Sequence, residues 1–448
     1  MSTVAVAALD VNSSARRRVF DELQSVVSRV ACACVRDVVN ESLDAEVDAR
    51  LGRGRWEPRA SSDEVAMPWE CHGCGAASSD AFRRNGHYTR GLSTLYGAVS
   101  GIRVPMLRCV RCGSSANVEY AALPKHQQLW WDVDEAALFK YGAEEGLRHI
   151  GEEVGDRLGW PVSASTIQSR VHKATEYLEQ WRKRPLDTSP DVVMLDGIWF
   201  TCMEDTGEYV TDAAGRRRPK QRRRKRVAII ALGLWSDSGD TEILDFEIAD
   251  SESESNCLRL LERLQDRGIS DRYVRLIVSD GAAGICAAIE TSYPTVARQR
   301  CVVHKLRNVF DNTRDSSHRK ELLAAASWIY EAETQAEANQ RLEQVISQWS
   351  GAEPQAIASL CQDFQASIAY LEPLGLSQPE RFCTTNAIEG GAMRPVRRRL
   401  DCATAYRTQV GADCALFLTI CRLNSRRKGE LWSQNSHSIL RALYNEIP

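Results

Sequence analysis

The sequence predicts a mixed α/β protein, and the order of its apolar segments is the main observation behind that prediction. Four β-branched runs, VVMLDGIWF, RVAIIALGLW, TEILDFEIA and YVRLIVSD, predict strands between residues 191 and 280. A helical pattern, NCLRLLERLQDRG, separates the last two runs, and a second, GAAGICAAIETS, follows the fourth. The order strand, strand, strand, helix, strand, helix is that of a ribonuclease H-like fold. The segment 314–378 is helix-forming throughout and predicts an all-α insertion.

The length of the chain predicts several domains. At 448 residues it exceeds what one hydrophobic core usually serves. We expect an N-terminal helical region with a linker (1–66), a zinc ribbon (67–130), a helix-turn-helix-like DNA-binding region (131–186), the first part of the core (187–313), the all-helical insertion (314–378) and the second part of the core with C-terminal helices (379–448). The net charge of −3 does not by itself indicate nucleic acid, so any basic surface must be local.

The N-terminal segment predicts a long amphipathic helix followed by a linker at 52–68. The start of the chain is a poor signal peptide, because Asp10 interrupts its short apolar run. No stretch approaches the roughly 18 apolar residues of a membrane span, so we expect an intracellular protein without a membrane partner. The apolar residues at helical spacing between 16 and 50 include Phe20, Leu23, Val27, Val30, Cys34 and Val38.

Two Cys-x-x-Cys-Gly motifs, CHGCG at 71–75 and CVRCG at 109–113, predict a structural zinc site. Each pair can form one knuckle, since the glycine admits a tight turn, and a strand-like segment joins the pairs as in a zinc ribbon. Four thiolates leave no open position, which disfavours a catalytic zinc; four buried cysteines are the alternative. The predicted ligands of one Zn²⁺ are Cys71, Cys74, Cys109 and Cys112.

Residues 133–180 predict helices, with a break at Gly159-Trp160-Pro161. Ser163 or Ser165 can cap the helix that follows, so the pair resembles a helix-turn-helix. Its second helix would offer Gln168, Arg170 and Lys173 to DNA. A purely structural helical hairpin is the alternative.

Three carboxylates stand in settings that predict phosphodiester chemistry. Asp196 and Asp280 lie in or at the end of apolar strands, where a charge needs compensation, and Glu389 is expected on a helix starting near Thr385. Together they could hold two divalent metal ions. The alternatives are a hairpin turn at Asp196-Gly197 and a strand-terminating turn at Asp280, while Glu389 alone is uninformative.

Other polar residues predict contacts with DNA. Cys301 and His304 share a Cys-x-x-His element that indicates either a buried pair or metal ligands, and Arg307 belongs to a polar face beyond it. The run at 216–226, between two strands, predicts a loop laid on phosphates, with a solvated face as the alternative. The basic residues of the two clusters are Arg216, Arg217, Arg218, Lys220, Arg222, Arg223, Arg224, Lys225, Arg226, Arg394, Arg397, Arg398 and Arg399.

The motifs DGIWF, IADSESE, LQDRGIS, VSDGAAG, YPTVARQRCVVHKLRN and TTNAIE followed by RPVRRR resemble the Mutator-like transposases, most closely their bacterial insertion-sequence relatives. The resemblance covers roughly 190–425. It implies a DDE catalytic core with the triad Asp196, Asp280 and Glu389, and it places the family's Cys-x-x-His element on Cys301 and His304. The four-cysteine ribbon and the long arginine run depart from the family's pattern.

The resemblance implies a transposase that cleaves the ends of an insertion sequence and transfers the freed 3′-hydroxyl to target DNA. Its expected cofactors are two Mg²⁺ or Mn²⁺ ions, beside the zinc. Its expected partners are double-stranded DNA, as terminal inverted repeats and target, and further copies of the chain in a homodimer or larger assembly. It would act in the bacterial cytoplasm at the nucleoid. The alternatives are a domesticated DNA-binding regulator without catalysis and a nuclease that cleaves without joining.

Overall fold

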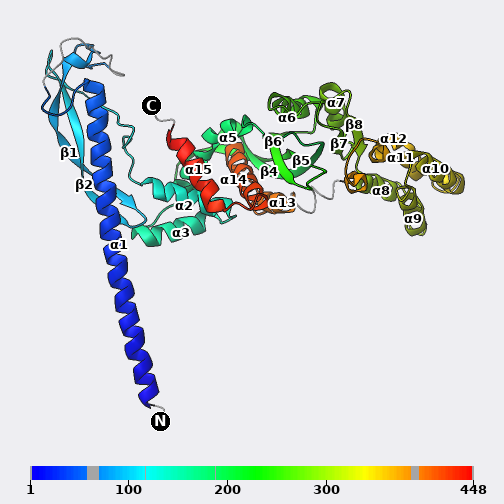
Figure 1. Cartoon of the computed structure of the whole chain (residues 1–448), viewed down its shortest axis with the longest axis horizontal. Helices are drawn as coiled ribbons and strands as arrows, with labels where there is room; N and C mark the ends of the chain where they lie inside the picture. Colours follow the sequence, from blue (N-terminus) through cyan, green and yellow to red (C-terminus); the bar gives the residue numbers. More distant parts are fainter. Residues whose placement is uncertain (1–2, 58–69, 117, 187, 385–392, 446–448) are drawn as a thin grey trace. The chain divides into compact units, whose positions relative to one another are not determined.

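The computed structural model describes residues 3–57, 70–116, 118–186, 188–384 and 393–445 (Figure 1). The chain forms two units, one of Met1–Tyr141, Glu145–Val171 and Leu440–Pro448 and the other of Gly142–Glu144 and His172–Ile439. Within the described ranges, no helix combines the length and the apolar character that a bilayer crossing requires.

The first unit begins with a long helix packed on a β-hairpin. Helix α1 spans Thr3–Leu51, and the hairpin consists of β1 (Phe82–Thr94) and β2 (Gly97–Cys109), with the short strand β3 (Ser115–Ala116) beside β2. The side chains of Val39, Leu43, Val47 and Leu51, from the second half of α1, are buried in one cluster with those of the hairpin. The predicted N-terminal helix is therefore present, and its second half supplies four of the buried residues of this core.

Four helices follow the hairpin: α2 (Trp131–Gly142), α3 (Leu147–Leu158), α4 (Ala164–His172) and α5 (Ala174–Arg182). Helix α3 ends at Gly159, which has a φ of 74°, as the Gly-Trp-Pro break predicts. Ser163 caps the next helix, since its Oγ accepts a hydrogen bond from the N–H of Thr166 at 3.1 Å. Helices α3 and α4 thus have the predicted two-helix arrangement, and α4 ends at His172, earlier than the sequence pattern suggests.

The second unit contains a five-stranded sheet in the order β6-β5-β4-β7-β8. The first three strands, β4 (Val192–Thr211), β5 (Arg217–Leu234) and β6 (Thr241–Ala249), form an antiparallel meander. Strands β7 (Leu276–Ser279) and β8 (Ala297–Arg300) are parallel to β4. Helix α6 (Glu254–Asp266) connects β6 to β7, and α7 (Ala283–Ser292) connects β7 to β8. All four predicted strands are present, while β8 is an addition.

The two faces of this sheet are covered by different helices. Alternate residues of β4, Val193 and Leu195, share a buried cluster with apolar residues of α6 and α7. On the other face, the ring centre of Phe246 of β6 is 6.4 Å from that of Trp181 of α5. The Trp181 ring centre is in turn 5.6 Å from that of Phe417 of α14 (Gln409–Arg427). Both faces are therefore buried, as a sheet with parallel members requires.

The predicted all-helical insertion has a hydrophobic core of its own. After α8 (Val302–Asp311) the chain forms α9 (Arg319–Ile329), α10 (Gln335–Trp349), α11 (Pro354–Cys361) and α12 (Phe364–Ser367). Their buried cluster extends from Val309 to Ile368. The insertion is tied to strand β8 through Gln299, whose buried amide donates to the carbonyl of Ser367 at 2.8 Å and accepts from the N–H of Tyr370 at 2.9 Å.

The C-terminal part of the chain is helical, with α13 (Met393–Asp401), α14 and α15 (Trp432–Asn445). Asn424 of α14 is buried against the edge strand β6. Its Oδ1 accepts from the N–H of Ile243 at 3.0 Å, and its Nδ2 donates to the carbonyl of the same residue at 2.9 Å. This pair of bonds satisfies both main-chain groups of a residue that has no neighbouring strand on that side.

Candidate functional site

The two aspartates predicted from the sequence lie at the same level of neighbouring parallel strands. Strand β4 pairs with β7 in a register that sets Met194 beside Val278. Asp196 and Asp280 each follow these paired residues by two positions. Because side chains alternate along a strand with period two, both carboxylates are expected on the face that carries Met194 and Val278, at the carboxyl end of the parallel pair.

The local geometry around the aspartates differs. Asp196 lies inside β4, opposite Ile230 of β5, and is only 5% exposed. Asp280 directly follows β7, and its Oδ1 accepts a hydrogen bond from the N–H of Ala282 at 2.9 Å. The hairpin-turn alternative at Asp196-Gly197 is therefore wrong, since the pair is in mid-strand. The chain does turn after Asp280, but the turn uses only Oδ1 of the carboxylate. Gly281 has a φ of 87°, the left-handed conformation that this turn needs.

A third carboxylate, Glu252, approaches both aspartates from the loop between β6 and α6. A Cβ atom on Gly197, the neighbour of Asp196, would lie 1.9 Å from Glu252 Oε1, so the glycine leaves the space that this side chain fills. Burial raises the pKa of Glu252 to about 7, and the negative charges of Asp280 and Asp196 act in the same direction. The sequence analysis missed Glu252, because it lies in the polar tract ADSESES, which is typical of a solvated loop.

Two cationic or ionisable groups border the carboxylates. His304, on the first turn of α8, opposes the rise in the pKa of Glu252 and therefore lies near it. Arg300, at the end of β8, is 7% exposed and packs against the turn after Asp280, where its Nε would be 2.6 Å from a Cβ on Gly281. Arg300 also forms an ion pair with Asp363 of the insertion at 3.2 Å. The insertion is thereby linked to the aspartate turn through one buried guanidinium.

The carboxylates form an open group. The ligand atoms of Asp196, Glu252 and Asp280 are not all within 4.8 Å of one another, whereas four cysteine sulfurs elsewhere in the described chain are. A two-metal site distributes its ligands over ions about 3.5–4 Å apart, so it does not require all of its ligand atoms to surround one point. Carboxylate oxygens are the donors that Mg²⁺ and Mn²⁺ prefer, and a bound cation would offset the repulsion that raises the pKa of Glu252.

Glu389, the third predicted carboxylate, lies outside the described residues. The Cys-x-x-His element is described. Cys301 is fully buried and precedes α8, its N–H donates to the carbonyl of Ser279 at 2.7 Å, and its thiol lies close enough to Cys383 to raise the pKa of that group. The element thus fastens α8 to the end of β7.

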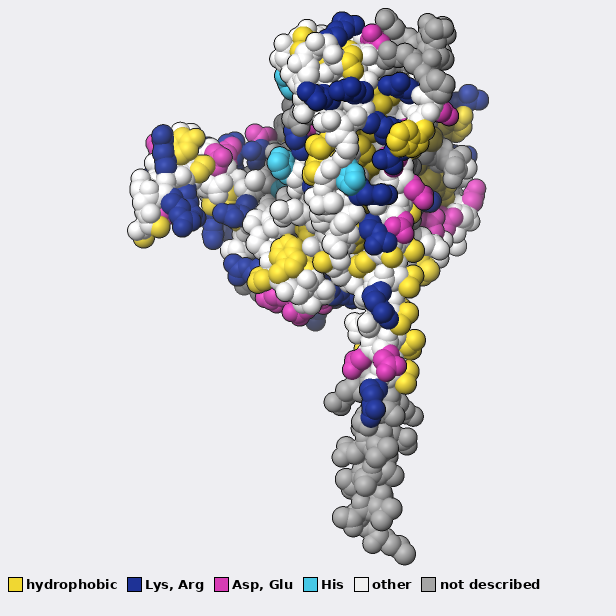
Figure 2. Space-filling view, turned by 90° about the vertical axis from the view of Figure 1, so that its left-hand side faces the viewer, with side chains coloured by type: hydrophobic (Ala, Val, Ile, Leu, Met, Phe, Trp, Pro, Cys, Tyr) yellow, Lys and Arg dark blue, Asp and Glu magenta, His cyan; other side chains and the backbone are white. Residues whose placement is uncertain are grey.

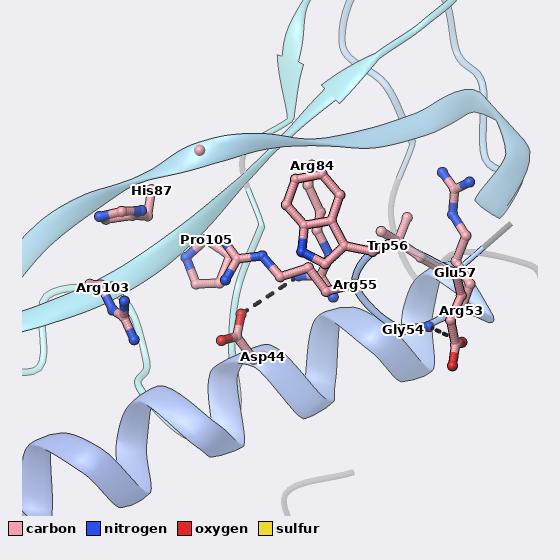
Figure 3. Close-up of a pocket in the computed structure, with 12 residues that line it drawn as sticks. Asp44, Arg53, Gly54, Arg55, Trp56, Glu57, Arg84, His87, Arg103 and Pro105 are labelled. Atoms are coloured by element: carbon pink, nitrogen blue, oxygen red, sulfur yellow. Dashed lines mark hydrogen bonds and ion pairs between the residues drawn. The ribbon is translucent and has the colours of Figure 1, made fainter.

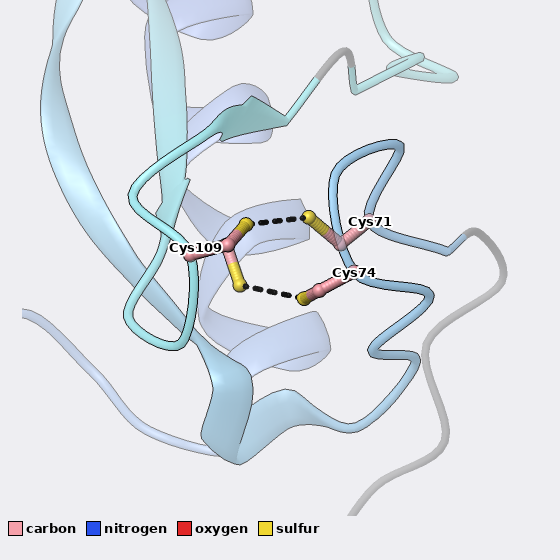
Figure 4. A group of neighbouring side chains, drawn as sticks. Cys71, Cys74 and Cys109 are labelled. Atoms are coloured by element: carbon pink, nitrogen blue, oxygen red, sulfur yellow. Dashed lines mark hydrogen bonds between the residues drawn. The ribbon is translucent and has the colours of Figure 1, made fainter.

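The four predicted zinc ligands converge (Figure 4). Cys71 Sγ is 3.5 Å from Cys112 Sγ, and Cys74 Sγ is 3.6 Å from Cys109 Sγ. Thiolates bound tetrahedrally at about 2.3 Å from zinc are roughly 3.8 Å apart, so the cluster fits a zinc ion. Gly75 and Gly113 both have positive φ, at 69° and 78°, as the two knuckles require.

The thiols of this cluster shift one another's pKa in opposite directions, and burial together with hydrogen bonds to the other three cysteines raises the pKa of Cys74 to about 12. The hydroxyl of Ser114, 3.3 Å from Cys112 Sγ, lowers the pKa of that thiol to about 6. Since a metal binds the thiolate, a depressed thiol pKa favours loading at neutral pH.

The arginine-rich run forms a strand, so the prediction of a loop is wrong. Residues 217–226 continue β5 beyond the sheet, paired with the outer part of β4 from Phe200 to Thr211. We call this two-stranded extension the β4–β5 arm. The facing strand β4 is rich in carboxylates. Opposite charges on neighbouring strands attract, so a run with this many arginines can pair as a strand. Ion pairs join Arg218 to Asp212, Lys220 to Glu208, and Arg222, Arg224 and Arg226 to Glu204, with Arg217 lying over the ring of Tyr209.

Two cations of this arm differ from their neighbours. Arg223 and Lys225 are exposed and project from the opposite face of β5, beside Met203 and Thr201. Neither has a carboxylate partner within the part of the chain that the structure describes. One face of the arm is therefore largely neutralised, while the other keeps its positive charge.

The remaining predicted DNA contacts divide by exposure. Arg170 of α4 is directed inward, 3.5 Å from the buried carboxylate of Asp134, and Arg399 is 5% exposed. Both geometries favour a structural role. Arg398 is exposed and pairs with Glu144 at 2.8 Å. The other candidates in described positions are Gln168, Lys173, Arg216, Arg307, Arg394 and Arg397, of which Arg216, Arg307, Arg394 and Arg397 are exposed.

Residues 53–57, from the start of the predicted linker, line a basic pocket in the first unit (Figure 3). The pocket has a volume of about 520 Å³ and lies between the end of α1 and the β1–β2 hairpin. Its wall includes Arg53, Arg55 and Arg103, and Trp56 is 94% exposed beside it. This second basic surface was missed because the sequence shows glycines and a proline there rather than a charge run.

Comparisons with known proteins agree on one family. The family described as "Transposase, Mutator family" matches residues 13–412. The transposase for insertion sequence element IS905 of Lactococcus lactis is 30% identical over 69% of this chain and 68% of its own length. That for ISRM5 of Rhizobium meliloti is 27% identical over 79% of this chain and 78% of its own. A solved Mos1 transposase paired-end complex shares 13% identity with a TM-score of 0.15, over 56% of this chain and 83% of that one; a score of this size does not indicate a shared fold.

The raised pKa of Glu252 predicts how stability depends on pH. Its folded pKa of about 7 exceeds the usual 4.5, so its contribution to stability is fully present below about 4.5 and is lost as the pH rises through 7. Glu252→Gln, which cannot ionise, should therefore gain thermal stability relative to the wild type between pH 5 and pH 8, measured without added Mg²⁺ or Mn²⁺. Glu254→Gln, exposed at the start of α6, is the control and should show no such gain. Equal pH profiles for the wild type and Glu252→Gln would contradict the placement of Glu252.

Proposed function

The chain belongs to the Mutator family of transposases, and we propose that Asp196, Asp280 and Glu389 are its catalytic carboxylates. Members of the family cut DNA and join strands. The observation that carries the assignment is that Asp196 and Asp280 each lie two residues beyond the last paired residues of β4 and β7, while Glu252 lies beside Gly197, the neighbour of Asp196. A strand pair of this kind can fix two metal-binding carboxylates with little freedom.

The sheet topology supports a ribonuclease H-like core. Three antiparallel strands are followed by a helix, a parallel strand and a further helix, which is the order expected from the sequence. The all-helical insertion follows Asp280 in the sequence, and Glu389 comes between it and α13. We take residues 187–313 and 379–448 as the two parts of the core and 314–378 as the insertion.

The proposed reaction has two in-line steps. Water attacks the phosphodiester at the end of the element and releases a strand with a free 3′-hydroxyl. That hydroxyl then attacks a phosphodiester of the target and displaces its 3′-oxygen, so one bond breaks for each bond that forms. Two Mg²⁺ or Mn²⁺ ions, when bound, would activate the attacking oxygen and offset charge on the phosphate.

The protein groups around the ions have distinct roles in this proposal. Asp196, buried in mid-strand, offers a fixed carboxylate, and Asp280 keeps one oxygen for a metal while the other holds the turn. Glu252 adds negative charge when it ionises, and a bound cation would compensate that charge. Arg300 holds the Asp280 turn against the insertion.

Removal of either aspartate should abolish cleavage while DNA binding persists. Asp196→Asn and Asp280→Asn are expected to lower the rate of cutting at an element end by on the order of 10³-fold, since each removes a metal ligand but little volume. Cleavage of labelled terminal-repeat DNA measures the rate, and a mobility shift measures binding. Asp237→Asn, exposed in the β5–β6 turn, is the matched control.

The same assay separates the alternatives. Wild-type protein that cuts without producing joined strands would be a nuclease, and wild-type protein that binds the repeats but does not cut with Mg²⁺ or Mn²⁺ would be a DNA-binding regulator. Undiminished cutting by Asp196→Asn would refute the assignment of the site.

We further propose that Cys71, Cys74, Cys109 and Cys112 hold one structural Zn²⁺ in a ribbon spanning 67–130. The fit of the sulfur separations and the two positive-φ glycines support it. Closure of the site by four thiolates suits folding rather than catalysis.

Substitution of one ligand should remove the metal. Purified wild-type protein should contain about one zinc per chain by elemental analysis. Cys109→Ser should contain almost none and should unfold in its first unit at a lower temperature, because metal binding contributes folding free energy. Cys402→Ser, exposed and distant from the cluster in sequence, should keep its zinc. Full zinc content in Cys109→Ser would exclude the four-ligand site.

The β4–β5 arm is proposed to contact the DNA backbone through its un-neutralised face. A two-stranded ribbon has the width to enter a major groove, and phosphates attract cations that have no competing carboxylate. The presence or absence of a carboxylate partner therefore divides the nine basic residues of the run. Arg223 and Lys225, which have no such partner among the described residues, are the strongest candidates for phosphate contacts.

Paired substitutions on the two faces test the arm. Arg223→Ser with Lys225→Ser should lower the slope of log affinity against log salt by about 1.8, or 0.9 for each lost phosphate contact. Arg222→Ser with Arg224→Ser removes the same charge from the face held by Glu204, and the slope should fall by less than half as much. Equal changes in this slope from the two pairs of substitutions would contradict the proposal that only one face of the arm contacts phosphates.

A further inference from the structure

The first half of α1 exposes a stripe of large apolar side chains. Val19, Phe20, Leu23, Val26, Val27 and Val30 are each between 45% and 65% exposed, although buried apolar residues fill the second half of the same helix. Figure 2 shows hydrophobic side chains following one edge of this helix. A single exposed valine needs no explanation, but a contiguous apolar stripe on a soluble protein usually marks a contact surface.

The stripe faces away from the hairpin on which α1 packs. At about 100° per residue, Val39 is turned roughly 160° around the helix from Leu23, and Leu43 is turned equally far from Val27. Val39 and Leu43 are the side chains buried against β1 and β2. The hairpin therefore cannot cover the stripe, and another surface must do so if it is to be buried.

The spacing of the stripe is that of a coiled-coil seam. Phe20, Val27 and Cys34 recur every seven residues, and Leu23 and Val30 lie between them in the second core position of the repeat. Val19 and Val26 widen the seam on one side. Such a 3.5-residue spacing keeps one edge of a helix against a partner helix over its length.

We propose that this stripe, residues 19–34 of α1, pairs with the same stripe of a second copy of the chain. A heptad seam is self-complementary, because the knobs of one helix fit the holes of an identical one. Charge supports the choice of partner. Between 19 and 34 the seam and flanking positions carry no charged residue, and Asp21, Glu22 and Arg29 lie outside them, so two copies bring no like charges into contact.

The length of the seam sets the strength of the pairing. Residues 19–34 span between two and three heptads, fewer than the three to four typical of an independent coiled coil. The association is therefore expected to be reversible and dependent on concentration. It places the first unit of one chain beside that of another without any contribution from DNA or from the catalytic carboxylates, so its test is independent of the proposed reaction.

One charge in the seam should weaken the association. The full chain, 50.0 kDa, is examined by sedimentation velocity without DNA over a range of concentration, in reductant. The wild type should approach twice the mass of one chain, and Val27→Glu should associate at least tenfold more weakly. Ser25→Glu adds the same charge on the polar side of α1 and should associate as the wild type does. Glutamate favours helix more than valine or serine, so neither change weakens α1 itself, which circular dichroism verifies.

Two results would overturn the proposal. If the wild type and Val27→Glu associate equally, the copies meet through another surface. If the wild type is a monomer and Val27→Glu melts at a lower temperature, the stripe is covered by another part of the same chain.

Discussion

The parallel pairing of β4 with β7 is the constraint on which the second unit depends. It brings together residues more than 80 positions apart and holds Asp196 and Asp280 at one level of the sheet. A crossover through α6 makes that pairing possible, and the loop that begins this helix carries Glu252 into the space above Gly197. Because the carboxylates repel one another, the arrangement is costly without a cation, and the packing on both faces of the sheet must hold it.

Strands, glycines and cysteines were the parts of the structure that could be predicted from residue patterns. The β-branched runs predicted four strands, because burial on both faces requires uninterrupted apolar sequence. Strand β8 was missed, since ARQR has no such run and is held by its parallel neighbour and by the side chain of Gln299. The knuckle glycines were predictable because a Cys-x-x-Cys turn needs a positive φ.

The site was predicted only in part, and the reasons are physical. Asp196 and Asp280 are recognisable because a charge in an apolar strand is unusual. Glu252 lies in a polar loop, and only the fold brings it near the two aspartates. The arginine run was interpreted as a loop because its own composition opposes a strand. The carboxylates that stabilise it lie across the hairpin, and Glu204, which pairs with Arg222, is 18 residues away in the sequence. Glu389 lies outside the described residues, so its place in the site stays a prediction, as do the domain boundaries.

Asn424 and Gln299 occupy corresponding positions at the two ends of the five-stranded sheet. Asn424 bonds both main-chain groups of Ile243 on the edge strand β6, and Gln299 of the opposite edge strand β8 is bonded to the insertion. An open strand edge is a template for another chain, and proteins that must meet copies of themselves at high local concentration are the most exposed to such aggregation. The amide of Asn424 thus occupies main-chain groups of the edge strand β6, and the amide of Gln299 joins the edge strand β8 to the insertion, so both edges are less open to the addition of a strand from another chain.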